Sequence, residues 1–531
     1  MNKWKKWGAA GAAAMMLLSS MSAVAAEAEA EAEAVYDANN PPIATTAAGQ
    51  VMGYMDDDTF AFLGIPYATA ERFEDPQDVE PWEGVRSAQT YGAVCPIPDQ
   101  TEVGADEMVW PHRYWIQNEQ CMNLNVWTQS LDTEAKKPVL VFFHGGGYNN
   151  GSSIEGASYE GKNLSDYGDV VVVTVNHRLN VLGFLDLTAY GDEYANTSNL
   201  GIKDLVASLE WVQENIANFG GDPDNVTIFG QSGGGGKVTT LMRTPAAEGL
   251  FDKAACISGG VGGITTEEAQ SIAPALLENL GLDESSVDEL KTIDYHTLIT
   301  AAAAACDEVG VSWSPENDGE YILDDYCEWA NDIPFIASSV FSEFNYSWQF
   351  DGPNKNEWTE EETMANLTEK YGDNAEAIAE EFQKVFPDKP LADAYFYAPT
   401  GLGRMGVESI LEGKLANATA PVYEYLFYYE VPVNGGILPI HCADLTFLFH
   451  NVDIPVVSRA TGGDETAHKV QDEMADALLA FAATGDPSTE NLAWAPYTAE
   501  EKNIMVFSEE SACTILGDEQ LCALMSGEAA E

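Results

Sequence analysis

Basic side chains are scarce in this chain of 531 residues, where 24 lysines and arginines stand against 86 aspartates and glutamates. The formal net charge is −62, and a field of that sign repels nucleic acid and anionic membrane surfaces. We therefore expect no nucleic-acid partner. The charge fits adaptation to high salt and, equally, an origin in a cell with generally acidic proteins.

Long apolar runs are also missing beyond the N-terminal region, so no membrane span is expected in the mature protein. Residues 1–25 begin with three lysines, continue through an alanine-, methionine- and leucine-rich stretch, and end in Ala23-Val24-Ala25. This is the pattern of a cleavable secretory signal. Residues 26–42 open with alternating alanine and glutamate, which cannot pack, and are interpreted as an acidic leader. The predicted protein is secreted.

None of the eight cysteines has zinc-ligand spacing, and no acidic loop matches a calcium motif, so no metal is expected. Cysteines in an exported chain favour disulfides. Cys256 and Cys442 are expected as free thiols, because both lie in a predicted core strand or active-site loop. The other six would close short local loops if paired as Cys95 with Cys121, Cys306 with Cys327, and Cys513 with Cys522.

Apolar runs that are rich in β-branched residues predict strands at 139–145, 170–176, 226–230, 334–339, 422–429 and 503–508. Their nearly continuous hydrophobicity is typical of a sheet that is buried on both faces. Residues 202–218 carry apolar side chains on one helical face and are followed by a turn. Strand, helix and strand in succession predict a parallel α/β sheet.

Residues 43–531 are interpreted as one domain, because no proline- or serine-rich linker divides them and no repeat occurs. Residues 352–420 are polar and helical in pattern. We expect them to form an insertion on the side of the sheet where the parallel strands end.

A glycine-rich turn lies within VTIFGQSGGGGKVTT, residues 226–240. It is not a phosphate-binding loop, because Gln231 replaces the first required glycine and Val238 replaces the required serine or threonine. A dinucleotide-binding fingerprint fails too, since Ser232 occupies its second glycine position. The stretch from Gly230 to Gly234 fits G-x-S-x-G, the turn that raises a nucleophilic serine above a sheet. Ser232 is the predicted nucleophile.

A second glycine motif, His144-Gly145-Gly146-Gly147, ends the strand predicted at 139–145. Such a segment presents backbone N–H groups to a developing negative oxygen. We expect the N–H groups of Gly146, Gly147 and Gly233 to form an oxyanion hole. His144 itself is expected to be structural.

These motifs, with FLGIPYATAERFEDP, VNHRLNVLGFL and GIKDLVASLEWVQENIANFGGDPDN, resemble the type-B carboxylesterase and cholinesterase family of α/β-hydrolases. The resemblance runs from about residue 43 to residue 508. It implies an α/β-hydrolase fold with a large central, mostly parallel twisted sheet, helices on both faces and helical insertions over the active site. It also implies hydrolysis of a small-molecule carboxylic ester through an acyl-enzyme, without a cofactor.

The family's chain order of serine, acid and histidine assigns two further residues. His441, in ILPIHCADLTFLF, is the expected general base, because a small and an acidic residue follow it as in the family motif. Glu343, in DIPFIASSVFSEF, matches the family's acid. The usual Asp-Glu-Gly is here Ser-Glu-Phe, which keeps Asp351 as a competitor. His177 and His450 are expected to be structural.

The resemblance also implies roles outside the triad. It pairs Cys95 with Cys121 in a disulfide, in agreement with the loop argument, and makes Arg72 and Asp204 structural salt-bridge residues. Trp110 lies where the family has a loop at the mouth of the active-site gorge, and so does Trp115. Either tryptophan would line a substrate pocket or lie in the core.

Gln231 stands where the family usually has glutamate, and Gly233 where it usually has alanine. Without that carboxylate beside the nucleophile, selectivity for cationic choline esters is not expected. A noncatalytic adhesion or binding protein on the same fold is the alternative from another class, and an amidase or lipase is the alternative among enzymes. The sequence specifies neither the ester nor the oligomeric state.

Overall fold

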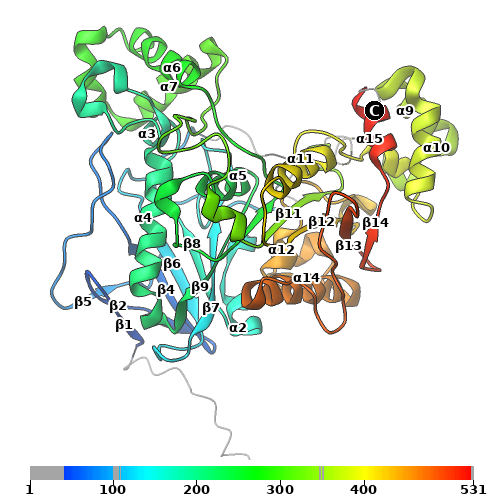
Figure 1. Ribbon diagram of the computed structural model, residues 1–531, viewed down its shortest axis with the longest axis horizontal. Helices are drawn as coiled ribbons and strands as arrows, with labels where there is room; N and C mark the ends of the chain where they lie inside the picture. The colour runs from blue at the N-terminus through cyan, green and yellow to red at the C-terminus, as the bar shows by residue number, and fades with distance from the viewer. Residues whose placement is uncertain are drawn as a thin grey trace, which may run out of the picture.

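A computed structural model describes residues 41–99, 104, 107, 109–345, 349 and 352–527 (Figure 1). The predicted signal and almost all of the predicted leader lie outside these ranges. Both stay predictions. Within the described part of the chain, no helix has the length and hydrophobicity needed to cross a bilayer.

The described residues form a main sheet of 11 strands. Their spatial order is β14 (Ala512–Ile515), β13 (Asn503–Phe507), β12 (Val422–Phe427), β11 (Phe335–Val340), β10 (Lys253–Ile257), β9 (Gly221–Gln231), β7 (Lys137–Phe143), β8 (Val171–Val175), β6 (Asn123–Thr128), β4 (Thr59–Pro66) and β3 (Tyr54–Asp56). The pairs from β13 across to β8 are parallel, and those at the two edges are antiparallel. All six predicted strands are present, so the predicted α/β fold is confirmed.

A smaller sheet is formed by strands from the first part of the described chain. It contains β1 (Ile43–Thr46), β2 (Gly49–Met52) and β5 (Val85–Ser87), in that order. Figure 1 shows these strands beside one end of the main sheet, below the long helix α4 (Leu200–Asn215).

The central strands are buried on both faces, as their unbroken hydrophobicity predicted. In β7, Val141 and Phe143 belong to one hydrophobic cluster, whereas Leu140 and Phe142 belong to the cluster on the opposite face. Successive side chains of a strand point to opposite faces, so a strand covered on both sides must be apolar throughout.

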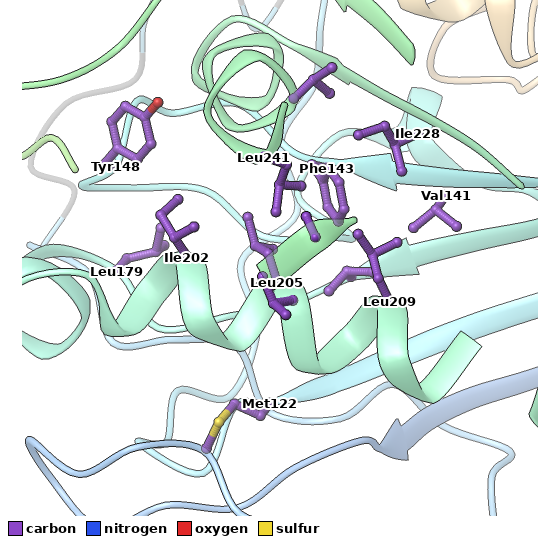
Figure 2. Packing of buried hydrophobic residues seen from close by; sticks show 14 of the residues in the cluster. Met122, Val141, Phe143, Tyr148, Leu179, Ile202, Leu205, Leu209, Ile228 and Leu241 are labelled. Atoms are coloured by element: carbon purple, nitrogen blue, oxygen red, sulfur yellow. The ribbon is translucent and has the colours of Figure 1, made fainter. Parts of the chain in front are cut away.

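The helix predicted at 202–218 is α4, followed by a 3₁₀ turn at Ile216–Phe219. Figure 2 shows its Leu205 and Leu209 directed toward the sheet, with Val141 and Ile228 nearby. The opposite face is covered by α14 (Glu465–Thr484), which contacts β7, β9 and the short helix α2 (Lys162–Gly168). Each face of the sheet therefore has its own layer of helices.

Residues 352–420 contain α9 (Glu360–Tyr371), α10 (Ala375–Val385) and α11 (Arg404–Leu415), so their helical pattern is confirmed. Helix α10 packs against α15 (Glu519–Ser526), and Figure 1 shows α9, α10 and α15 together at one end of the molecule. Their apolar side chains form a cluster with Phe341. The remaining α-helices described are α3 (Asn180–Phe184), α5 (Gly233–Leu241), α6 (Thr266–Asn279), α7 (Tyr295–Val309), α12 (Leu445–Leu448) and α13 (Ser458–Thr461).

Candidate active site

Ser232 lies in the sharp turn between β9 and α5, where it has φ 58° and ψ −124°. A positive φ is uncommon for a residue other than glycine and marks a strained position. The turn closes only because its neighbours are glycines. A Cβ on Gly230 would lie 2.4 Å from the carbonyl oxygen of Gly234, and a Cβ on Gly234 would lie 2.0 Å from that of Phe143. The predicted nucleophile therefore lies in the expected strand-to-helix turn, which raises its side chain above the sheet.

Glu343 and His441 form a direct pair. The Glu343 Oε2 atom lies 2.5 Å from His441 Nδ1, and the backbone N–H of His441 donates to the Glu343 carbonyl at 3.0 Å. Glu343 is only 3% exposed and His441 9%. A buried carboxylate at Nδ1 holds the proton on that nitrogen and leaves Nε2 to act as a base.

The second oxygen of Glu343 is held as well. Oε1 accepts a hydrogen bond from the Ser258 hydroxyl at 2.8 Å and another from the backbone N–H of Val340 at 2.9 Å. Ser258 directly follows β10 and Glu343 closely follows β11, so neighbouring parallel strands deliver both residues to one edge of the sheet. Sequence reasoning missed Ser258, whose only signal is its place after a buried strand.

The three predicted oxyanion-hole residues lie together. Gly146 has φ +80° and Gly147 φ +62°, in the left-handed region that favours glycine. A Cβ on Gly233 would lie 2.3 Å from the Gly147 carbonyl oxygen, so the backbones of the two predicted donor segments are in contact. The geometry suits donors that converge on one oxygen.

The sequence profile of the carboxylesterase family matches residues 40–523. The chain belongs to the carboxylesterase family. It is 32% identical to the para-nitrobenzyl esterase of Bacillus subtilis over 88% of this chain and 95% of that protein. It is 29% identical to the phenmedipham hydrolase of Pseudarthrobacter oxydans over 89% of this chain and 96% of that protein.

Among solved structures, it is similar to an esterase from the anaerobe Clostridium hathewayi that can hydrolyze aliphatic aromatic polyesters. The TM-score is 0.87 and the identity 38%, over 93% of this chain and 99% of that one. The family and these relatives make the chain a carboxylic ester hydrolase with the α/β-hydrolase fold.

Two of the esterase's three predicted catalytic side chains, Ser232 and His441, open into one cavity of about 590 Å³, and Glu343 does not line it. Ser232, His441 and the glycines from Gly145 to Gly147 form part of its wall, with Trp110, Tyr114, Tyr159 and Phe344 adding aromatic surface. Trp110 is thus a pocket residue. Trp115 does not line this cavity; it is 43% exposed and lies edge-to-face against Tyr91. No described residue of 352–420 lines the cavity, so these helices do not form its lid.

Nε2 of His441 faces the side-chain amide of Gln231 at 3.1 Å. The Cys442 thiol donates to the amide oxygen of Gln231 at 3.2 Å, which leaves the amide nitrogen toward the imidazole. Among the described residues, no hydrogen bond joins the Ser232 hydroxyl to His441. Such bonds often form only once substrate is bound. Sequence reasoning singled out Gln231 but not this contact.

The other predicted histidines have structural surroundings. His144 stacks on His177, and burial holds the pKa of each imidazole well below its ordinary value, so both are neutral. His450 stacks on Tyr167 and contacts Asp472.

The two predicted salt-bridge residues each have a partner. Arg72 binds Glu119, and Asp204 binds Arg178 at 2.6 Å in a buried pair. Asp351, the competing acid, lies outside the described residues.

All eight cysteines are thiols in this structure. Cys95 and Cys121 are both buried, and a hydrogen bond from Cys95 together with burial raises the pKa of the Cys121 thiol. The predicted disulfide between them stays a prediction. Among the described residues, no cluster of histidine, cysteine or acidic side chains is placed to hold a metal ion.

Proposed function

We propose that this chain is an exported serine esterase that works through an acyl-enzyme with Ser232, His441 and Glu343. The observation that carries the proposal is the 2.5 Å contact of Glu343 with His441, which lines the same cavity as Ser232. The Ser232 oxygen attacks the ester carbonyl carbon while its proton passes to Nε2 of His441. The N–H groups of Gly146, Gly147 and Gly233 stabilise the resulting oxyanion.

His441 then returns the proton to the departing alcohol, and the acyl group stays on Ser232. A water molecule repeats the sequence in reverse: His441 takes its proton, the oxygen attacks the acyl carbon, and the carboxylic acid leaves. Glu343 stabilises the imidazolium that forms in each half.

Intact mass after exposure to a fluorophosphonate tests this mechanism. We expect one adduct on the wild type and none on Ser232→Ala, because only an activated serine reacts. A folded wild type without an adduct would contradict the mechanism and favour the noncatalytic binding protein considered above.

Export rests on the residue 1–25 pattern and is tested on material secreted by the native host. We expect an N-terminus at Ala26 and no cell-associated precursor. A peptide map of the unreduced protein tests the Cys95–Cys121 disulfide, which joins the two peptides that contain these cysteines and lowers their summed mass by two hydrogens. Retention of residues 1–25 in the mature protein would contradict export by a cleaved signal.

A second candidate substrate class is aliphatic aromatic polyester, as for the Clostridium hathewayi relative. It is favoured by an exposed apolar rim, which we define as Tyr114, Trp115, Ile116 and Phe344. Their exposed fractions are 60%, 43%, 73% and 60%, and Tyr114 and Phe344 also line the cavity. Exposed apolar patches of this kind mark interaction surfaces.

Release of soluble products from a polyester film tests this candidate. Ile116→Ser is expected to lower the rate on the film several-fold and to leave the rate on a soluble aryl ester unchanged. Ile515→Ser, at an isoleucine in β14 that is 55% exposed, is the control. Equal film rates for both variants would argue against a role of the rim.

A further inference from the structure

Lys237 is a fully buried lysine in α5, one helical turn after Gly233. Its ammonium nitrogen donates a hydrogen bond to the backbone carbonyl of His144 at 2.9 Å. Lysine is almost never fully buried without a specific partner, because removing its charge from water is costly. The mechanism above does not use this side chain.

The hydrogen bond joins the two backbone segments that carry the predicted oxyanion donors. Gly233 opens α5, whereas Gly146 and Gly147 follow His144 in the glycine segment. The backbones of these segments touch, and a Cβ on Gly234 would lie 2.9 Å from the same His144 carbonyl. The glycines allow the close approach but supply no side chain to hold it, and Lys237 supplies one.

We propose that Lys237 is a positioning residue of the oxyanion hole. By holding the His144 carbonyl, it fixes the segment of Gly146 and Gly147 against the helix that begins with Gly233. It does not line the cavity, so it acts through the backbone rather than on the substrate. The proposal rests on the proposed function, because the oxyanion hole belongs to it.

The charges around the ammonium group support this role. It faces the neutral imidazoles of His144 and His177, the Tyr148 ring at 5.8 Å, the Cys95 thiol and the Glu155 carboxyl. Burial lowers the pKa of Lys237 to about 7, and the charge of Glu155 acts in the opposite direction. Protonated Lys237 makes a charge-assisted bond to the His144 carbonyl, which is stronger than the bond of a neutral amine.

The test compares Lys237→Met with Lys414→Met. Lys414 is also fully buried and donates to a backbone carbonyl, that of Ala330, from α11. Rates are divided by the number of serines that a fluorophosphonate titrates, so unfolded molecules do not count. We expect Lys237→Met to lower kcat about 10–100-fold with little change in KM, since a lost oxyanion donor costs roughly 10²–10³ and a loosened one costs less. Lys414→Met should keep the wild-type kcat per titrated site.

A transition-state analogue gives a second readout. A trifluoromethyl ketone should bind Lys237→Met more weakly by the factor lost in kcat/KM, whereas a purely structural role would leave its affinity per folded molecule unchanged. Wild-type kcat and wild-type ketone affinity in Lys237→Met would overturn the proposal. A wild type that gives no Ser232 adduct would instead overturn the proposed function on which it rests.

If Lys237→Met does not fold, the pH dependence of kcat in Glu155→Gln tests the proposal instead. Removing the Glu155 charge lowers the pKa of Lys237 further, so kcat should begin its alkaline decline at a lower pH than in the wild type. An unchanged alkaline limb in a folded Glu155→Gln would overturn the proposal.

Discussion

The side-chain amide of Gln231 lies 3.1 Å from Nε2 of His441, the nitrogen that must receive the Ser232 proton. The residue before the nucleophile therefore contacts the predicted base across 210 positions of sequence. A neutral amide at this place adds no charge next to Nε2, so Glu343 is the carboxylate in direct contact with the imidazole.

Gln231→Glu should move the acidic limb of kcat/KM to higher pH, because a second carboxylate favours the protonated, inactive imidazole. It should also raise the relative rate on a choline ester over its neutral isostere. Both are read from pH–rate profiles on the two substrates. Gln231→Met removes the amide without adding charge and is the control; an equal shift in that variant would show that the lost hydrogen bond is responsible.

Glu343→Gln is expected to lower kcat by about 10³–10⁴-fold while the fold stays intact, because the imidazole loses its partner and its correct tautomer. Ser258→Ala should cost much less, since it removes one hydrogen bond to Glu343 and leaves the carboxylate. Asp351→Asn is the control and should be nearly normal. A large loss of kcat in Asp351→Asn together with a small loss in Glu343→Gln would instead assign the role of the acid to Asp351.

Gly233→Ala tests the close contact between the two oxyanion segments. The added methyl group would meet the Gly147 carbonyl oxygen at 2.3 Å, so the donors must separate. We expect kcat to fall by about 10–100-fold at nearly constant KM. Gly413→Ala in α11, where a Cβ meets nothing within 4 Å, should leave activity unchanged. Full activity in Gly233→Ala would mean that the two segments tolerate the extra methyl group. The family usually has alanine at this position, so its other members accommodate that group.

Asp444 gives the esterase a pH-dependent stability. Its carboxylate is fully buried and accepts from the Tyr425 hydroxyl at 2.8 Å, and burial together with the charge of Glu343 raises its pKa from 3.8 to about 6. Between these values the folded chain keeps a proton that the unfolded chain has lost. The free energy of unfolding should therefore fall as pH rises through this window, by about 3 kcal/mol at most.

Urea denaturation at a series of pH values measures this contribution, with Asp444→Asn as the comparison. The variant should show a flatter profile between pH 3.8 and about 6. The same slope in both proteins would assign the pH dependence to other buried carboxyls, of which Glu424 is one with a pKa raised to about 7.

Local sequence patterns were sufficient to predict the turn at Ser232 and the six strands. Gly230 is required by its close contact with the Gly234 carbonyl, four residues along the chain, and such a local contact leaves a signature in spacing. Glu343 and His441 came only from the resemblance, because no local pattern distinguishes a catalytic carboxylate from the many others in this acidic chain. Their 2.5 Å contact is a property of the fold.

Contacts between distant segments could not be predicted. Gln231 with His441 and Lys237 with His144 depend on side-chain rotamers and on the way that α5 meets β7. The helices of 352–420 were recognised by their pattern, but nothing in a polar helix says which neighbour it packs against. The structure places α10 on α15, away from the cavity.

Ser232, Ser258 and Glu343 follow β9, β10 and β11, three adjacent parallel strands. A slip of one residue in the pairing of any of them would turn its side chains to the opposite face. A fluorophosphonate that labels Ser232 therefore counts only molecules in which the central sheet has reached its native register. During refolding, the growth of this label would follow the formation of the sheet itself.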